Sequence, residues 1–398
     1  MRRKSPHGIN STPRATNPWN SIGLATLLLG VSLVSTPLLG QEASESSTGS
    51  GAQESQAAGV SSTSAANPVN PDPVAQETPD ETETQNNAER LAAAFQATQK
   101  DLSAESLDRV IETCESVLSG EPNPDDQAYA VQLAVWGLTQ RSGLEDVTHE
   151  AAIQSLDRAI ELNPKAWKAY LARAWHFGSD AKFEQAISDL DVAIDLEPKS
   201  TKAWFNRAEL HYQLENYVLA VRDYTRVIVM DPRDAQAYTG RGHAYFQLTK
   251  HQEAMSDYQK VVLLTEGSPA ALMHRAEVCQ TVGLWEKARD DYQLAAARDP
   301  KSGLPQVRLA WLYATCPDSS IADPDLAVQL AERAIKLRGS DDWSAANTLA
   351  TACATAGDFE RANAILAEWE ALLTGSDLEL LHSTREVVAQ LSEAQEKK

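Results

Sequence analysis

The chain has 398 residues, and hydrophobic residues make up 42% of it, an ordinary share for a soluble protein. Its formal net charge is −21, which excludes the basic face that nucleic-acid phosphates require. The sequence contains no Gly-Lys-Ser/Thr phosphate loop, no His-Glu-x-x-His and no Gly-x-Ser-x-Gly, so it predicts neither an enzyme nor a cofactor.

The first forty residues are predicted to be a signal peptide or an N-terminal anchor. Four basic residues precede an uncharged apolar run at 22–39, and no acidic residue occurs before Glu42. The run is between the length of a signal-peptide core and that of a short membrane span. We therefore expect an exported protein of the periplasm or cell envelope, with cleavage after Gly40 or Ala43 favoured. Retention as a membrane tether through 22–39 is the alternative.

Residues 41–86 are predicted to be a disordered acidic linker rich in Ser, Thr and Pro. The segment contains eight acidic residues but no Lys, Arg or aromatic residue. Such a composition cannot bury enough apolar surface to offset the entropy of ordering the chain. A flexible spacer is the simpler interpretation, and a segment that a partner orders is the alternative.

The folded body is predicted to begin near Asn86 and to contain only helices. Apolar residues at helical spacing predict a divergent hairpin within 87–125, formed by helices Glu89–Lys100 and Ala104–Leu118. The next unit, 126–166, is expected to have an enlarged turn around 140–148.

A 34-residue period organises most of the remaining chain. Pro164, Pro198 and Pro232 are 34 residues apart, and Pro300 follows two periods later. Two short helices cannot bury their apolar faces alone, so a period of this length indicates stacked helical hairpins. The array at 126–375 divides into the units 126–166, 167–200, 201–234, 235–268, 269–302, 303–342 and 343–375.

The unit 201–234 shows the pattern most clearly, with predicted helices at Lys202–Gln213 and Val218–Met230. Its signature resembles the tetratricopeptide repeat (TPR) of exported bacterial proteins, on the residues Trp204, Ala208, His211, Ala220, Tyr224, Val227 and Pro232. The resemblance implies an all-α TPR helical-hairpin solenoid, a right-handed superhelix. Residues 376–398, with a helix at Leu378–Glu396, are expected to cap its C-terminal end.

Each regular unit is predicted to contain an Arg–Asp pair. Where the TPR signature has Leu, this chain has arginines, and an aspartate follows each of them by sixteen residues. In an antiparallel hairpin such positions face each other, which favours a structural pair over an arginine ladder for acidic ligands. The four pairs are Arg173–Asp189, Arg207–Asp223, Arg241–Asp257 and Arg275–Asp291.

The starts of the first helices carry capping residues. Side-chain oxygens at these positions can accept hydrogen bonds from free N–H groups of the opening turn. The predicted caps are Ser200, Asp234, Ser268 and Ser302, whereas Ala166 breaks the series.

The histidines and cysteines are expected to pack rather than to react. A metal site from His211, His243 and Cys279 is the less favoured alternative. Buried thiols are expected for the four cysteines, and a disulfide between Cys316 and Cys353 is left open.

The family resemblance implies that the first helices line a concave groove through positions 2, 5, 9 and 12 of each unit. We expect an exposed aromatic surface with few charges, suited to an apolar peptide, although each ring has packing against a neighbour as its alternative. The candidate groove residues are Trp175, Lys202, Phe205, Glu209, Tyr212, His243, Phe246, Met273 and Trp311.

The sequence therefore predicts a non-catalytic scaffold or adaptor of the cell envelope that binds a peptide or protein partner in this groove. An architectural envelope protein that associates with itself is the alternative. The sequence leaves the partner, the pathway and the oligomeric state open.

Overall fold

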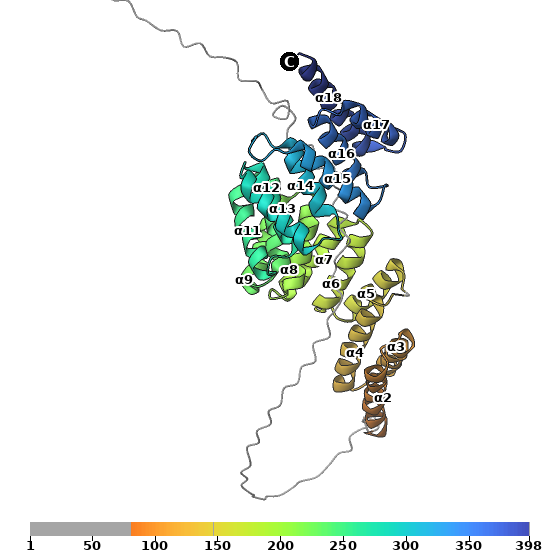
Figure 1. The fold of residues 1–398 in the computed structure, drawn as a ribbon. Helices are drawn as coiled ribbons and strands as arrows, with labels where there is room; N and C mark the ends of the chain where they lie inside the picture. Colours follow the sequence, from red (N-terminus) through yellow and green to blue (C-terminus); the bar gives the residue numbers. More distant parts are fainter. Residues whose placement is uncertain (1–80, 146, 398) are drawn as a thin grey trace, which may run out of the picture. The chain divides into compact units, whose positions relative to one another are not determined.

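The computed structural model describes residues 81–145 and 147–397, and every regular element in these ranges is an α-helix (Figure 1). Successive helices form antiparallel hairpins, which confirms the all-α repeat solenoid. The predicted signal segment 1–40 and the predicted linker up to residue 80 lie outside the described residues.

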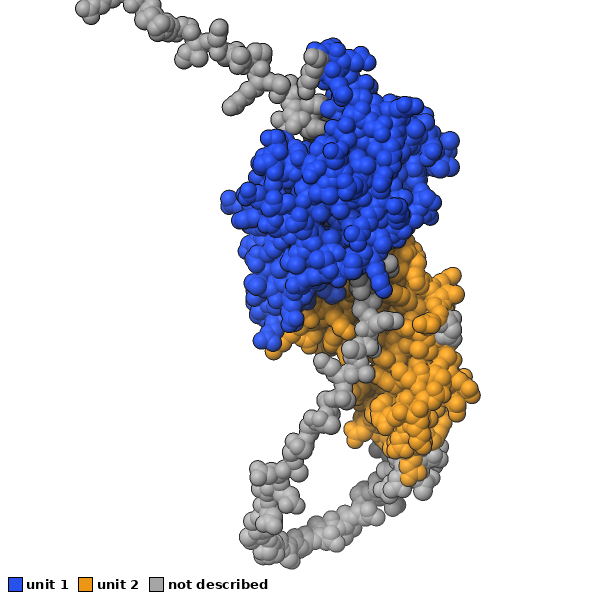
Figure 2. All heavy atoms as spheres, in the orientation of Figure 1, with its two compact units in different colours: residues 1–36, 208–398 blue, residues 37–207 orange. Residues whose placement is uncertain are grey.

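The chain divides into two compact units at Arg207–Ala208, inside α8 (Thr201–Gln213) (Figure 2). We call the described part of the first, 81–207, the N-terminal unit, and that of the second, 208–397, the C-terminal unit. The N-terminal unit contains α2 (Glu81–Lys100), α3 (Ala104–Ser119), α4 (Pro124–Ser142), α5 (His149–Leu162), α6 (Trp167–Ser179) and α7 (Phe183–Leu196).

The C-terminal unit continues the series of hairpins from the second part of α8 onward. Its further helices are α9 (Tyr217–Met230), α10 (Ala235–Gln247), α11 (His251–Leu264), α12 (Pro269–Thr281), α13 (Trp285–Arg298), α14 (Leu304–Thr315), α15 (Pro324–Arg338), α16 (Trp343–Thr355), α17 (Phe359–Glu370) and α18 (Gly375–Glu396).

The first helix begins earlier than the sequence predicts. Helix α2 starts at Glu81, so the predicted start near Asn86 is too late, and the last six residues assigned to the linker are helical. Pro79 is the last proline before it, and no residue of 81–100 removes a backbone donor, so nothing stops the helix from extending toward the N-terminus.

Three of the four predicted caps are confirmed. Asp234 accepts from the Ala237 N–H at 2.9 Å, and Ser200 and Ser268 each accept from the N–H three residues later at 3.3 Å. Ser302 accepts a hydrogen bond from the Leu304 N–H at 3.5 Å, but the N-cap residue is Gly303, because α14 begins one residue later than predicted. That glycine has φ +72°, a left-handed conformation that glycine adopts without strain.

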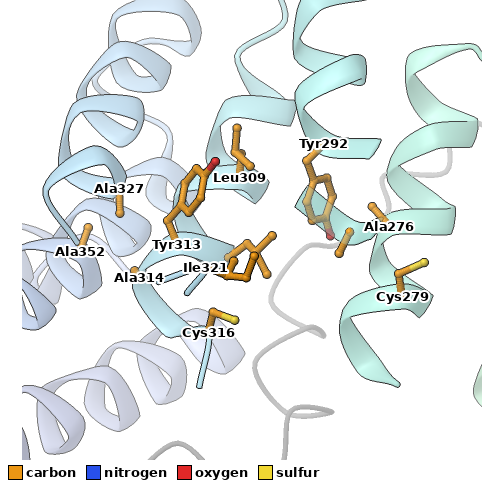
Figure 3. Close-up of a cluster of buried hydrophobic side chains, with 12 residues drawn as sticks. Ala276, Cys279, Tyr292, Leu309, Tyr313, Ala314, Cys316, Ile321, Ala327 and Ala352 are labelled. Atoms are coloured by element: carbon orange, nitrogen blue, oxygen red, sulfur yellow. The ribbon is translucent and has the colours of Figure 1, made fainter. Parts of the chain in front are cut away.

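Small residues let the helices approach closely, and large rings fill the remaining space. Gly240 lies so close to the buried Tyr224 that an added Cβ would be 2.6 Å from the ring atom Cε1. Figure 3 shows a related cluster in which Tyr292 of α13 and Tyr313 of α14 pack with residues of α12. Interdigitated packing of this kind fixes the phase of each hairpin against the next.

The four cysteines are free and buried. Cys316 packs in the cluster of Figure 3, whereas Cys353 packs with Leu349 and Leu381 in a second cluster. The disulfide between Cys316 and Cys353 that the sequence left open is therefore not formed, and each thiol serves as a small apolar side chain.

Candidate functional site

The arginines of the first helices hold the repeats together. The guanidinium groups of Arg173, Arg241 and Arg275 each donate two hydrogen bonds to the predicted aspartate, over 2.6–2.9 Å. This confirms three of the four pairs. The fourth pair, Arg207–Asp223, lies within one repeat, but Arg207 belongs to the N-terminal unit and Asp223 to the C-terminal unit, so this pair stays a prediction.

Each of these arginines also reaches the second helix of the preceding repeat. A further bond runs from Arg173 to Asp157 at 2.6 Å, from Arg241 to Thr225 at 3.1 Å, and from Arg275 to Gln259 at 2.5 Å. The hydrogen bonds to Asp291 raise the pKa of Arg275 above its usual value. These three guanidinium groups thus form hydrogen bonds within the repeats and do not form a ladder for acidic ligands.

Four rings form a continuous row in the C-terminal unit, contributed by Tyr212, His243, Tyr258 and His274. The ring centroids of His243 and His274 are 4.7 Å apart, and Tyr258 stacks on His274 at 5.5 Å with an interplanar angle of 21°. The Tyr212 ring is 6.3 Å from that of His243. We call these four residues the ring row.

The ring row carries no charge at neutral pH. Burial lowers the pKa of His243 to about 3, and the adjacent His274 adds to the effect. Burial also lowers the pKa of His274. The two rings approach through His243 Nε2 and His274 Nδ1 at 3.5 Å, which suits one N–H donor facing one bare nitrogen.

Two ionisable side chains near the row are also engaged. The Tyr224 hydroxyl donates a short hydrogen bond to the carboxylate of Glu209, and burial raises the pKa of that carboxyl. On α12 and α14, Glu277 lies 3.6 Å from Arg308. The row is therefore an apolar and hydrogen-bonding strip bordered by compensated polar groups.

The structure brings some of the predicted groove residues together and separates others. Tyr212 and His243 belong to the ring row, whereas Phe246 packs edge-on against His251 with centroids 5.5 Å apart. Met273 packs against the cluster of Figure 3, and Trp311 is a half-buried residue of α14.

The remaining candidates lie in the N-terminal unit. Trp175 packs edge-on against His149 and His176, with centroids 5.6 and 4.6 Å apart. Lys202 is exposed at the start of α8, and Phe205 is half-buried on the same helix.

The expectation of an exposed aromatic surface is corrected by the burial of these residues. Of the nine candidates only Lys202 is exposed, and the other eight are half-buried. The physical reason is visible in the ring row, where rings that follow one another along the repeats pack against each other, His243 and His274 edge to face and Tyr212 tilted against His243.

Two members of the ring row were missed by sequence reasoning. His274 occupies the sixth position of its unit, next to the fifth position that the family pattern assigns to the groove. Tyr258 belongs to a second helix, which the pattern assigns to packing alone. The 31-residue spacing of His243 and His274, close to one period, was a signal that could have joined them.

The considered metal ligands do not gather. His243 lies against His274, His211 is 3.9 Å from Asp223, and the Cys279 sulfur is 3.9 Å from that of Met255. Among the described residues no group of three or more His, Cys, Asp or Glu side chains is placed to bind a metal ion. Within the same part of the chain, no helix combines the length and the apolarity needed to cross a bilayer.

Comparison with solved structures finds several repeat proteins that are similar to this chain. The structures most similar to this chain include a tetratricopeptide repeat protein from Parabacteroides merdae (15% identity, TM-score 0.46), covering 77% of this chain and 99% of that one. YrrB, titled a TPR protein with an unusual peptide-binding site, is 18% identical (TM-score 0.41), covering 49% of this chain and 97% of its own. MamA from Desulfovibrio magneticus is also 18% identical (TM-score 0.40), with 43% and 95% covered.

Sequence comparison is more specific. No curated protein matches the chain. Two family models, both described as tetratricopeptide repeat, match residues 171–224 and 235–267. These segments fall within the hairpins that the 34-residue period predicts and that the structure contains. The chain therefore contains tetratricopeptide repeats at these residues.

Proposed function

We propose that this protein is a non-catalytic adaptor whose C-terminal unit binds a peptide or protein segment along the ring row. Tetratricopeptide repeats support a protein-interaction scaffold, and they are typically not enzymatic. The single observation that carries the finer proposal is the row itself, a strip of uncharged rings on consecutive repeats.

The chemistry of the row defines the segment that it would accept. Aromatic faces and edges favour apolar or aromatic side chains of the partner. A neutral imidazole offers one N–H donor and one nitrogen acceptor, which match the carbonyl and amide groups of a peptide backbone. A segment dense in charge would lose hydration against these rings without gaining an opposite charge.

The proposed adaptor works in the cell envelope. The basic start and the apolar run at 22–39 support export, and the acidic segment that follows supports a spacer between a surface and the repeats. Mass spectrometry of the intact protein from its own cells tests this. A chain that begins at residue 41 or 44 is expected after cleavage, and a full-length chain confined to the cytosol contradicts export.

Selection of peptides from a random displayed library on the immobilised full chain tests the binding site. Enriched peptides should be poor in charged residues, and their Kd should rise at least about tenfold for a double variant with Tyr212→Ala and His243→Ala. Tyr129→Ala, which removes an exposed ring of the N-terminal unit, is the matched control and should leave the Kd unchanged. Thermal melts of all three proteins exclude unfolding as the cause.

The same protein tests the architectural alternative. Light scattering coupled to size exclusion should show a mass that does not change with concentration if the adaptor proposal holds. Concentration-dependent growth in mass, together with failure to enrich any peptide, would favour self-association instead.

A further inference from the structure

A second site involves residues of α12 that do not belong to the ring row. A cavity of about 600 Å³ opens between α11, α12 and α13, and its apolar lining comes from Met255, Cys279 and Leu284. The helix turns by about 100° per residue. Arg275, which lines the cavity, therefore points roughly opposite to Met273, which occupies a predicted groove position, whereas Cys279 points about 120° away from Met273.

Comparison of the repeats explains why a cavity exists at this place. Cys279 is the eleventh residue of the unit 269–302. At the eleventh position of the three preceding units stand Phe177, His211 and Tyr245, each of which has a ring. The unit 269–302 is thus the one among these four consecutive units that supplies a small thiol in place of a ring.

In two of the other units the structure shows what surrounds that ring. The guanidinium carbon of Arg173 lies 5.7 Å from the centroid of the Phe177 ring, and that of Arg241 lies 5.8 Å from the Tyr245 centroid. A lysine ammonium lies 5.9 Å from each of the same two centroids. The eleventh position is therefore an aromatic position enclosed by cations.

The cationic part of this arrangement is retained beside the cavity. Arg275 lines the cavity and donates two hydrogen bonds to Asp291. Arg173 and Arg241 bind their own aspartates in the same bidentate geometry. Lys287 lies on the rim. The floor is soft and apolar, with the Cys279 sulfur 3.9 Å from the Met255 sulfur. Figure 3 shows Cys279 on α12 at the edge of the buried cluster.

We propose that this cavity receives a phenylalanine or tyrosine side chain from an exposed segment of a partner protein. The incoming ring would take the place that Phe177 and Tyr245 fill in their own repeats. It would meet the guanidinium of Arg275 through a cation–π contact and the Met255 thioether through a sulfur–aromatic contact. The site adjoins the ring row, because Met255 packs in one cluster with Tyr258, but Arg275 and Cys279 do not belong to the row.

A partner protein is favoured over a second copy of the chain by the composition of its surface. Among the described residues, twelve large apolar side chains are exposed, and Tyr129 is the one aromatic residue in that set. A second copy would therefore offer the cavity mainly Leu and Val, which lack the ring face that Arg275 would contact.

The test uses the full chain and a probe peptide, acetyl-Ser-Gly-Phe-Gly-Ser amide, in which the phenylalanine carries a 4-fluoro label. Fluorine NMR should show a saturable shift with the parent protein and at least an about tenfold weaker affinity with Cys279→Tyr, which fills the cavity as Tyr245 fills its own repeat. Tyr129→Ala, which removes an exposed ring of the N-terminal unit, should bind the probe like the parent. Absence of saturable binding to the parent, or equal binding to Cys279→Tyr, would overturn the proposal.

A second variant keeps the test decisive if Cys279→Tyr fails to fold. Leu284 is exposed and occupies the position of Lys182 and Lys250, which lie over the rings in their repeats. Leu284→Lys should therefore tighten binding of the probe, and unchanged or weaker binding would count against the site. Self-association of the parent that Cys279→Tyr abolishes would identify a second copy as the occupant and overturn the assignment to a partner.

Discussion

At the scale of single residues, the arginine–aspartate pairs concentrate charge where water is scarce. The Asp257 side chain is 5% exposed and receives two hydrogen bonds from Arg241. Removal of the arginine would leave a buried carboxylate without its partner, which costs more than the pair contributes. We expect Arg241→Ala to lower the free energy of unfolding by about 2–3 kcal/mol.

Chemical denaturation followed by circular dichroism measures this loss. Arg289→Ala is the matched control, because Arg289 pairs with Asp290 on the surface, where a pair contributes about 0–1 kcal/mol. Equal losses for the two variants would show that the buried geometry of Arg241 has no special role.

Gly240 makes a second prediction about a single residue. Its backbone lies against the ring of Tyr224, and an added Cβ would clash with a side chain that is 1% exposed. We expect Gly240→Ala to lower the free energy of unfolding by about 2 kcal/mol. Gly143→Ala, where the nearest atom would be 3.6 Å away, should change stability by less than about 0.5 kcal/mol. A neutral Gly240→Ala would contradict the packing at this crossing.

The ring row predicts a dependence of stability on pH. Because the pKa of folded His243 is about 3 and the ordinary value is 6.5, the unfolded chain binds a proton between these values and the folded chain does not. Stability from this residue is therefore complete above pH 6.5 and falls as the pH drops toward 3, by at most about 2 kcal/mol at pH 5. His243→Phe should flatten this part of the profile, and a slope equal to that of the parent would contradict the neutral imidazole.

At the scale of helices, local signals and the repeat period agree on most boundaries. Asp234 caps α10 and the N–H of Ala237 donates to it, so the helix begins where the sequence predicts. We expect Asp234→Ala to cost about 1 kcal/mol and Asp234→Asn clearly less, because an amide oxygen also caps. Denaturation midpoints compare the two variants, and an equal effect of both would assign the loss to charge rather than to the cap.

The sequence could predict the hairpins because a 34-residue period fixes their phase without any knowledge of distant contacts. It also paired Arg275 with Asp291, since both belong to one hairpin. It could not predict the bond from Arg275 to Gln259, which depends on how far one repeat turns against the next. The replacement of Ser302 by Gly303 as the cap likewise depends on the backbone turn before α14, which residue type alone does not determine.

The candidate site was harder to predict than the helices. Positions 5, 9 and 12 of a unit locate a face but not the packing on that face, so the sequence could not decide between exposure of Tyr212 and His243 and their packing against neighbours, and the structure shows both half-buried. His274 and Tyr258 joined the row from positions assigned to other roles. The departure of Cys279 from the aromatic pattern was visible in the sequence. The sequence did not show whether neighbouring side chains would fill the space that the smaller Cys279 side chain leaves.

At the scale of the whole molecule, the protein combines a described body of helical repeats with a sequence that predicts export and a spacer. Each repeat depends on its neighbours to bury the apolar surface that two helices alone would leave exposed. The arginines also link consecutive second helices through hydrogen bonds. Such a body presents many similar surfaces, and departures from regularity make individual surfaces differ. The ring row and the cavity at Cys279 are two such departures, and α12 contributes residues to both.

Hydrogen exchange measured by mass spectrometry tests the central claim most directly. The full chain is compared with and without a peptide selected from the random library, at a peptide concentration well above its Kd. The account predicts slower exchange in the first helices α10 and α12, which carry His243 and His274, with little change in the second helices α13 and α15. Protection confined to the second helices, or no protection at all with the peptide bound, would contradict it.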